Sequence, residues 1–141
     1  MHFGGGSPTM LKPEDMIALG TVLRDSFDFL ADAKISVEIE PHDMDEARLD
    51  ALSEIGMARA SLGVQDFDPE VRKAINREQS FLQTKAVVDI RSRGVGSVNL
   101  DLLYGLPHQT RESVCSTVAQ ALTLEPDRMA LFGTCSRSIR L

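Results

Sequence analysis

The chain has little cysteine, no long apolar run and no cluster of basic residues. Of its 141 residues only Cys115 and Cys135 are cysteines, and they form no CxxC motif, zinc-site spacing or disulfide framework. No segment approaches the roughly 18 apolar residues that cross a bilayer, and no signal peptide opens the chain. The formal charge is −6, without a clustered lysine and arginine face. These absences predict a cytoplasmic protein that enters no membrane, binds no nucleic acid and holds no metal through its own cysteines.

Short apolar segments alternate with longer amphipathic ones along the chain. This pattern is typical of strand and helix units around a parallel sheet, and 141 residues are enough for one domain. We expect strands over residues 35–40, 58–64, 97–104 and 129–132, and helices over residues 13–28, 44–55, 69–75, 80–93 and 110–122. Gly56 and Gly94 are the expected end points of two of these helices. The pattern favours an α/β barrel or part of one, although a doubly wound open sheet fits it as well.

The segment HFGGGSPT, residues 2–9, precedes the first expected helix. Three successive glycines leave backbone amide and carbonyl groups bare, so a polar ligand can come closer than any Cβ would permit. We interpret the segment as the lip of a ligand site, although three glycines by themselves are as often a flexible loop. Almost no apolar strand end precedes the glycines, and the chain is therefore expected to begin inside a fold.

Alternate residues of the expected strands form a polar face. Its members are Ser36, Glu38 and Glu40 in the first of these strands, Ser61, Gly63 and Gln65 in the second, and Asn99, Asp101 and Leu103 in the third. In a barrel plugged by packing side chains these positions would be apolar, so we expect a lined cavity near the carboxyl ends of the strands. Taken alone, Glu38 fits a solvent-facing carboxylate and Arg77 fits a cation at a helix end. Asp101 lies among apolar neighbours and needs a partner.

The remaining candidate side chains carry weaker signals. His2, His42 and His108 fall in unrelated loop contexts, which argues against a catalytic role for each of them. Cys115 lies between Val114 and Val118 on an expected helix, so it fits a small side chain of the core.

Four segments carry a family resemblance: HFGGGSPT, ISVEIEP, ASLGVQDFDPEVRKAINREQSF and SVNLDLLYGLPHQT. In this order and spacing they closely resemble the oxygen-independent coproporphyrinogen III oxidases, which are radical S-adenosylmethionine enzymes of haem biosynthesis. GGGSPT and YGLP are shared with the related haem chaperones. GVQDF followed by INREQSF favours the oxidases, because the chaperone-like relatives usually have GVQSF and a Gly-Arg-x-His sequence where this chain has NREQ at residues 76–79.

The resemblance implies part of a (βα)6 barrel of the radical SAM type, a partial TIM-like barrel with parallel strands and outer helices. Its lumen would hold a [4Fe-4S] cluster, S-adenosyl-L-methionine and the tetrapyrrole. A 5′-deoxyadenosyl radical would abstract hydrogen from two propionates of coproporphyrinogen III, and loss of carbon dioxide plus one electron from each would leave the vinyl groups of protoporphyrinogen IX. The resemblance also implies an electron donor for the cluster and a full-length enzyme that is monomeric.

The same resemblance implies a set of cofactor-binding residues: Gly5, Gly6, Ser7, Glu38, Gln65, Arg77 and Asp101. The glycines and the serine would contact the methionyl end of S-adenosylmethionine. Glu38 and Gln65 would hydrogen-bond its ribose, and Arg77 would pair with its carboxylate through a planar fork of donors. Asp101 would complete the polar wall.

Two departures from the family pattern set the expected boundaries. The family holds its cluster with a CxxxCxC loop that is absent from this sequence, so the cluster ligands are expected outside this chain. The likeness stops after Phe132, and residues 134–141 resemble a frameshift or the end of a fragment. We therefore expect residues 1–133 to be a fragment of the radical SAM core domain, lacking its first strand and cluster loop, inactive alone and exposed at both sheet edges.

Two other functions fit parts of the sequence. A related radical SAM haem chaperone would bind and transfer haem without catalysis. An α/β module that binds a nucleotide without radical chemistry is the weakest alternative, because GGGSPT lacks the lysine of a P-loop and the spacing of a dinucleotide fingerprint.

Overall fold

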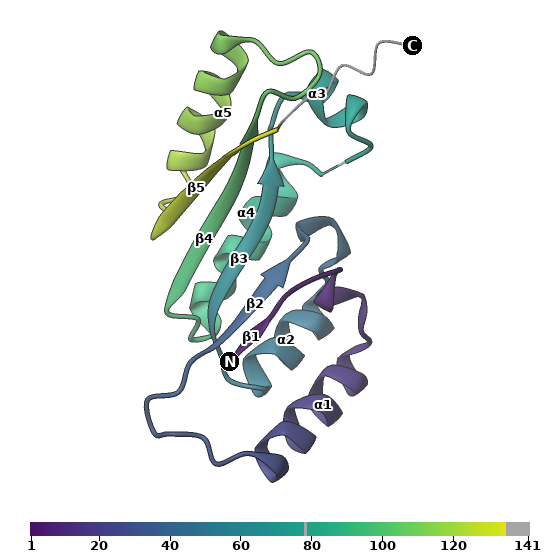
Figure 1. Ribbon diagram of the computed structural model, residues 1–141, viewed down its shortest axis with the longest axis vertical. Helices are drawn as coiled ribbons and strands as arrows, with labels where there is room; N and C mark the ends of the chain where they lie inside the picture. Colours follow the sequence, from purple (N-terminus) through teal and green to yellow (C-terminus); the bar gives the residue numbers. More distant parts are fainter. Residues whose placement is uncertain (78, 135–141) are drawn as a thin grey trace.

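The computed structural model describes residues 1–77 and 79–134. Within these residues five parallel strands form one sheet, and neighbours in the sheet are consecutive in the chain (Figure 1). The strands are β1 (His2–Phe3), β2 (Ile35–Ile39), β3 (Met57–Gln65), β4 (Ser97–Tyr104) and β5 (Arg128–Gly133). The α-helices between them are α1 (Pro13–Ser26), α2 (Glu46–Glu54), α3 (Pro69–Ala74), α4 (Phe81–Val88) and α5 (Arg111–Leu122).

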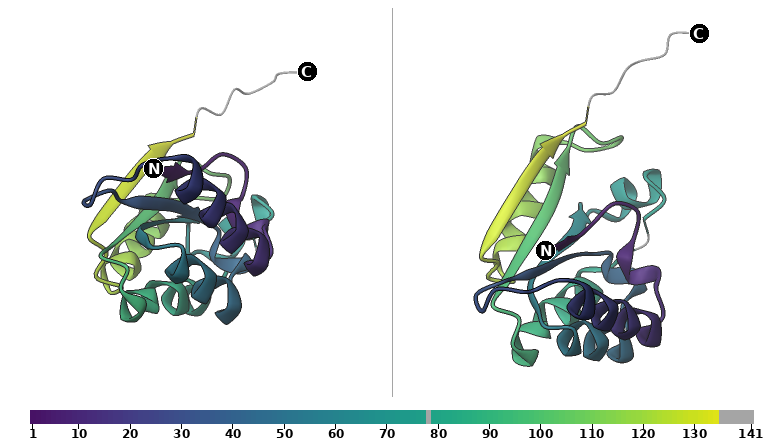
Figure 2. Two further views of the ribbon diagram at one scale, coloured as in Figure 1. Left: turned by 90° about the horizontal axis from the view of Figure 1, so that it is seen from below. Right: turned by 60° about the horizontal axis from the view of Figure 1, so that its bottom comes forward.

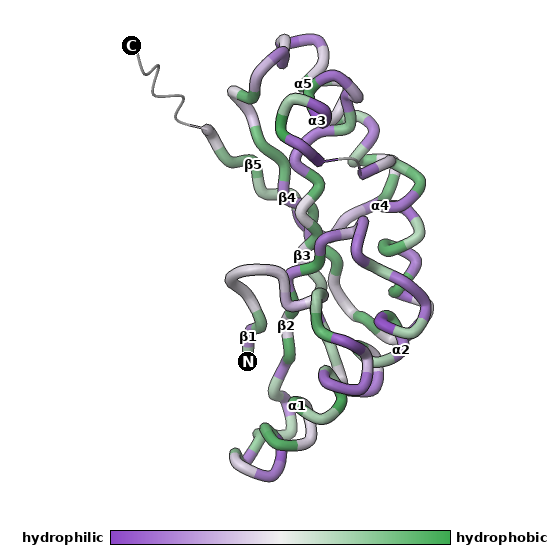
Figure 3. Tube along the Cα trace, turned by 90° about the vertical axis from the view of Figure 1, so that its right-hand side faces the viewer, coloured by the Kyte–Doolittle hydropathy of each residue, from purple (hydrophilic) through white to green (hydrophobic). Residues whose placement is uncertain are grey.

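All of these helices lie on one side of the sheet, and the other face is open (Figures 2 and 3). Strands in chain order with helices on one face form the wall of a βα barrel. A doubly wound sheet instead reverses its strand order and carries helices on both faces. The structure therefore confirms the barrel-type α/β prediction over the open-sheet alternative.

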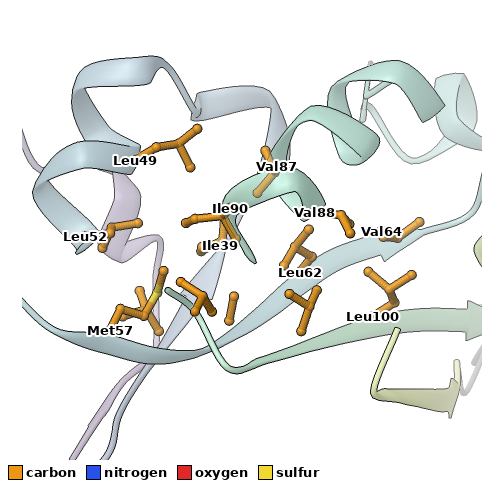
Figure 4. Packing of buried hydrophobic residues seen from close by; sticks show 14 of the residues in the cluster. Ile39, Leu49, Leu52, Met57, Leu62, Val64, Val87, Val88, Ile90 and Leu100 are labelled. Atoms are coloured by element: carbon orange, nitrogen blue, oxygen red, sulfur yellow. The ribbon is translucent and has the colours of Figure 1, made fainter. Parts of the chain in front are cut away.

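The core fills the space between the sheet and the helices. Figure 4 shows strand side chains packed under α2, α4 and the short 3-10 helix Asp89–Arg93. The labelled residues are Ile39, Leu49, Leu52, Met57, Leu62, Val64, Val87, Val88, Ile90 and Leu100, and all are buried. Burying one such side chain stabilises the fold by roughly 1.5–3 kcal/mol. Every second residue of a strand points into this core, so the residues between them point to the open face of the sheet.

The predicted strands and helices are confirmed, and most of their ends differ by one or a few residues. The helix expected over residues 80–93 begins with a capping box of Ser80 and Gln83, but it changes after Val88 to the 3-10 helix Asp89–Arg93. Gly94, at φ +92°, then ends that turn as expected. A 3-10 helix at Pro41–Asp43 precedes α2, which begins at Glu46. The residues before the glycines do form a short strand, β1, which pairs with Ser36 and Val37 of β2.

The edges of the described sheet are β1 and β5. Apolar side chains of β5 are exposed: Met129, Leu131 and Phe132. Thr134 continues the pairing of β5 through a bond from its N–H to the carbonyl oxygen of Tyr104 at 2.9 Å. The rest of the tail expected at residues 134–141 lies outside the described residues. No helix in the described part of the chain is long and apolar enough to cross a bilayer.

Candidate functional site

The polar side chains gather on the open face towards the carboxyl ends of the strands, as strand parity predicted. The register aligns Glu38 of β2 with Ser61 of β3 and with Asn99 of β4. The next row towards the carboxyl ends pairs Gly63 with Asp101. In barrels of parallel strands this end carries the functional loops, because every connection that leaves a strand starts there.

The three glycines after β1 are needed for different structural reasons. Gly5 and Gly6 have φ of +79° and +65°, and a Cβ built on either would meet no atom within 4 Å. A Cβ on Gly4 would collide with His2 and would lie 2.8 Å from Glu38 Oε1. Gly4 is thus required by packing, whereas Gly5 and Gly6 present a bare backbone to open space. This is the open cradle that a polar ligand needs in order to contact main-chain groups.

Ser7 follows the cradle and precedes the 3-10 helix Pro8–Met10. Its backbone is extended, and its side chain makes no capping hydrogen bond to that helix. Its carbonyl oxygen accepts the Met10 N–H at 3.0 Å. The hydroxyl of Ser7 is therefore not committed to the cap of the turn that follows it.

Glu38 joins the glycine segment to the sheet. Its Oε2 accepts the Gly5 N–H at 3.2 Å, and its Oε1 lies 3.3 Å from Nε2 of His2. Nδ1 of His2 in turn lies 2.8 Å from the Ser36 hydroxyl. The Glu38 side chain is 47% exposed, so its remaining lone pairs face the open side. The loop context expected for His2 was wrong, because His2 belongs to β1 and contacts a site carboxylate.

Arg77 forms an ion pair with Glu40, the residue that follows β2. Arg77 leaves the end of α3 through a turn in which its N–H bonds the Arg72 carbonyl oxygen at 2.9 Å. Its side chain is 33% exposed and that of Glu40 is 20% exposed. The site prediction omitted Glu40, although strand parity had placed it on the polar face. Strand parity could not predict that Arg77 pairs with Glu40, because the two residues lie far apart in the sequence.

Gln65 ends β3 close to the same ion pair. A Cβ on Gly63 would lie 3.0 Å from Gln65 Nε2 and 3.3 Å from Glu40 Oε1. The amide and the carboxylate therefore converge over a glycine whose missing side chain leaves room for both. The structure thus brings Gln65, Arg77 and Glu40 together at the carboxyl ends of β2 and β3.

Asp101 has the partners that its apolar sequence context demanded. It accepts the Ser61 hydroxyl at 2.8 Å and the Asn99 amide nitrogen at 2.7 Å, and that amide also lies 3.0 Å from the Ser61 oxygen. All of these partners are neutral, so none of them forms an ion pair with Asp101. A hollow of about 400 Å³ adjoins this cluster and is lined by His2, Ser36, Arg59, Ala60, Ser61, Ser97, Asn99, Arg128, Met129 and Ala130.

No group of three or more His, Cys, Asp or Glu residues in the described ranges is arranged to hold a metal ion. Cys115 is exposed on α5, so the core position expected for it was wrong. The helix turns Thr117 and Ala121 to the core instead. The donor set of the described residues therefore does not fit an iron–sulfur cluster, whereas the glycine cradle and its polar neighbours fit an organic ligand with charged and hydroxyl groups.

The fold and the polar edge together define an α/β barrel domain with a candidate site at the carboxyl edge of its strands. The chain belongs to the Radical SAM superfamily, because residues 1–121 match the model of that family. The fold is thus of the radical SAM type.

Within this superfamily, the chain is most usefully compared with two coproporphyrinogen III oxidases. The chain is 52% identical over 134 residues to an oxygen-independent coproporphyrinogen III oxidase of Paracoccus denitrificans. It is 51% identical over 134 residues to an anaerobic coproporphyrinogen III oxidase of Cereibacter sphaeroides. Each alignment covers 94% of this chain, and the chain spans 30% of the length of these relatives.

A solved structure gives the same comparison in three dimensions. The coproporphyrinogen III oxidase of Escherichia coli, described as a radical SAM enzyme, superposes with a TM-score of 0.91 at 42% identity. The match covers 95% of this chain and 31% of that one. The likeness therefore extends over nearly all of this chain and under a third of the solved protein.

Proposed function

We propose that this chain is part of an oxygen-independent coproporphyrinogen III oxidase and supplies the edge of its barrel that binds S-adenosyl-L-methionine. The enzyme would convert two propionates of coproporphyrinogen III to the vinyl groups of protoporphyrinogen IX. The observation that carries the proposal is the bare backbone of Gly5 and Gly6 beside the half-exposed carboxylate of Glu38. The similarity to oxidases at 52% and 51% identity supports the same reaction.

The groups at this edge match the parts of the cofactor. Main-chain groups at Gly5 and Gly6 that no Cβ screens suit the charged methionyl end, to which Ser7 adds a hydroxyl, while the Gly5 N–H is held by Glu38. Glu38 has lone pairs available for ribose hydroxyls, and the Gln65 amide can both donate and accept. S-adenosylmethionine, when bound and reduced, supplies the hydrogen-abstracting power that the reaction needs.

Arg77 and Glu40 act as a pair in this scheme. The guanidinium has five N–H donors in a fixed fork, so its contact with Glu40 leaves donors for the ligand carboxylate. Glu40 holds the arginine over the site before the ligand arrives, which reduces the ordering cost of binding. Asp101, held by Ser61 and Asn99, forms the polar wall on the β4 side.

The cluster does not belong to this set of residues. The described side chains offer no site for it, and we derive no electron transfer from them. The enzyme that we propose is a cytoplasmic monomer that receives electrons from a separate donor and whose cluster ligands lie outside this chain.

The test uses a chimeric oxidase, in which residues 1–133 of this chain replace the matching segment of the Paracoccus denitrificans relative. We expect it to convert coproporphyrinogen III under anaerobic conditions. Glu38→Gln and Arg77→Ala should each weaken equilibrium binding of S-adenosylmethionine on the order of tenfold, as expected for loss of a charge-assisted hydrogen bond. Glu54→Gln, an exposed change on α2, is the matched control.

The outcomes separate the proposal from its alternatives. Unchanged binding after Arg77→Ala would remove this residue from the site. A chimeric oxidase that binds haem but leaves coproporphyrinogen III unchanged would favour the haem chaperone. A chimeric oxidase with neither property, while the unaltered relative turns over, would contradict the proposal.

A further inference from the structure

Gln65 has an unusual backbone. Its φ is +65°, a value that residues with a side chain rarely adopt. The Asp66 N–H donates to the Val64 carbonyl oxygen at 2.8 Å, which closes a three-residue γ-turn centred on Gln65. With positive φ at its centre this turn is the rare and strained form. The pairing register between β3 and β4 also shifts between Gly63 and Gln65. Some surrounding contact must therefore hold the turn in place.

Asp66 supplies that contact from below the turn. The residue is only 1% exposed, so its carboxylate lies in the interior of the protein. Oδ1 accepts the Asp68 N–H at 2.7 Å and the Thr117 hydroxyl at 2.6 Å, and Oδ2 accepts the Gln109 amide. These partners are neutral, yet together they satisfy both oxygens. A buried carboxylate is costly unless it is fully hydrogen-bonded, so the arrangement fixes Asp66 in one place.

The partners of Asp66 belong to other elements of the barrel. Thr117 lies on α5, and its oxygen also accepts the Phe67 N–H at 3.2 Å. Gln109 lies in the loop after β4, where its Oε1 accepts the Leu106 N–H at 3.0 Å and its Nε2 donates to the Leu103 carbonyl oxygen at 2.8 Å. The residue next to Gln65 is thus tied to the following strand, loop and helix.

We propose that Asp66 is a positioning residue for Gln65. Anchored on Thr117 and Gln109, its carboxylate keeps Gln65 in the strained turn, so that the Gln65 amide stands over Gly63 beside Glu40. This inference rests on the proposed contact between Gln65 and the ribose of S-adenosylmethionine. Asp66 itself touches no ligand in this scheme.

A double-mutant cycle in the chimeric oxidase tests the proposal, with equilibrium binding of S-adenosylmethionine as the readout. Gln65→Ala removes the side-chain amide. Asp66→Asn keeps the shape of the side chain but replaces one of the two oxygens, which accept hydrogen bonds from Asp68, Thr117 and Gln109, with an NH₂ group that cannot accept one. Each single change should weaken binding on the order of tenfold. If Asp66 acts through Gln65, the double variant should bind no more weakly than Gln65→Ala alone.

Thr117 provides a gentler pair of variants in case Asp66→Asn fails to fold. Thr117→Val removes the hydroxyl that donates to Asp66 at nearly constant volume, and Thr117→Ser keeps it. We expect Thr117→Val to weaken binding several-fold, and this effect should disappear in the Gln65→Ala background. Thr117→Ser should bind as the parent does.

Three results would overturn the inference. Asp66→Asn and Thr117→Val could leave binding unchanged while Gln65→Ala weakens it, which would refute the inference and spare the proposed site. Asp66→Asn could weaken binding by the same factor with and without Gln65, which would assign it a general structural role. Unchanged binding after Gln65→Ala would refute the ribose contact of the proposed function, and the inference with it.

Discussion

The substitution Gly63→Ala should separate the stability of the fold from the binding of the ligand. The added Cβ would lie 3.0 Å from Gln65 Nε2 and 3.3 Å from Glu40 Oε1, and both atoms are the far ends of flexible side chains. Each must move by a few tenths of an ångström. Gly63 lies within β3, where glycine is disfavoured relative to alanine by roughly 0.5–1 kcal/mol. The new methyl group should therefore leave the fold equally or slightly more stable.

Ligand binding should change in the opposite direction. If the Gln65 amide is displaced from its place over Gly63, one oriented hydrogen bond to the ligand is lost, which is worth about 0.5–1.5 kcal/mol or roughly two- to twelvefold in affinity. The assay compares the thermal midpoint of the chimeric oxidase with its equilibrium affinity for S-adenosylmethionine. We expect an unchanged or higher midpoint together with weaker binding.

Gly96→Ala is the matched control for this experiment. Gly96 lies just before β4, far from the carboxyl edge, and its added Cβ would meet only the Ala58 carbonyl oxygen at an ordinary 3.7 Å. This variant should bind the cofactor as the parent does. Equal affinities of Gly63→Ala and the parent for S-adenosylmethionine would refute the proposed contact between the Gln65 amide and the ligand. A lowered thermal midpoint would refute the argument that the added methyl group does not destabilise the fold.

Three further outcomes are expected. Gln65→Gly should raise the free energy of unfolding by up to about 1 kcal/mol, because glycine adopts φ +65° without strain, while it weakens cofactor binding; calorimetry and a binding assay check the two effects. The hydrogen bond from the Val98 N–H is the main cause of the lowered pKa of Asp127, and the Arg91 guanidinium lowers this pKa further. The Asp127 carboxylate therefore stabilises the fold at pH values above the usual aspartate pKa of about 3.9, and this contribution is lost as the pH falls through the lowered pKa. Asp127→Asn should accordingly reduce the thermal midpoint at pH 7, and a difference between the variant and the parent that did not shrink as the pH fell through the lowered pKa would contradict this reasoning. Leu62→Ala, at a fully buried position, should cost about 2–5 kcal/mol in chemical denaturation, and a loss under about 1 kcal/mol would show that the position is not part of a packed core.

Local patterns were sufficient to predict most of the fold. Ile35, Val37 and Ile39 alternate with polar residues, and the structure buries these three while Ser36 and Glu38 face away from the core. Such alternation is visible in the sequence because a strand has a period of two residues. The strand β1 was not visible in this way, because His2 and Phe3 are too few to show a period and depend on pairing with β2.

The site was predictable in part. Strand parity placed Glu38, Gln65 and Asp101 at one edge, where the structure also has them. The pairing of Arg77 with Glu40 joins residues 37 positions apart, and no periodic pattern records such a contact. The roles of the predicted residues towards a cofactor came from a resemblance and stay predictions.

The exposed Cys115 shows a further limit of pattern reading. Val118 does pack against the core, but the buried residues of α5 are Thr117 and Ala121, and Cys115 lies outside that face. Thr117 is polar and buried because Asp66 requires its hydroxyl. A helix face chosen by a buried hydrogen bond cannot be recognised from hydrophobicity alone.

Because the strands lie in the sheet in chain order, the groups of the candidate site are arranged in a row in the same order as in the sequence. The glycine segment follows β1, the acids lie on and just after β2, Gln65 ends β3 and Asp101 lies on β4, so the sequence order of these groups is also their order in space. In the proposed complex each βα unit would meet a different stretch of the bound molecule. Hydrogen bonds such as those between Gly5 and Glu38 or Ser61 and Asp101 join adjacent units. A ligand lengthened or shortened at one end would therefore be sensed by one terminal unit, while the units at the far end would keep their contacts unchanged.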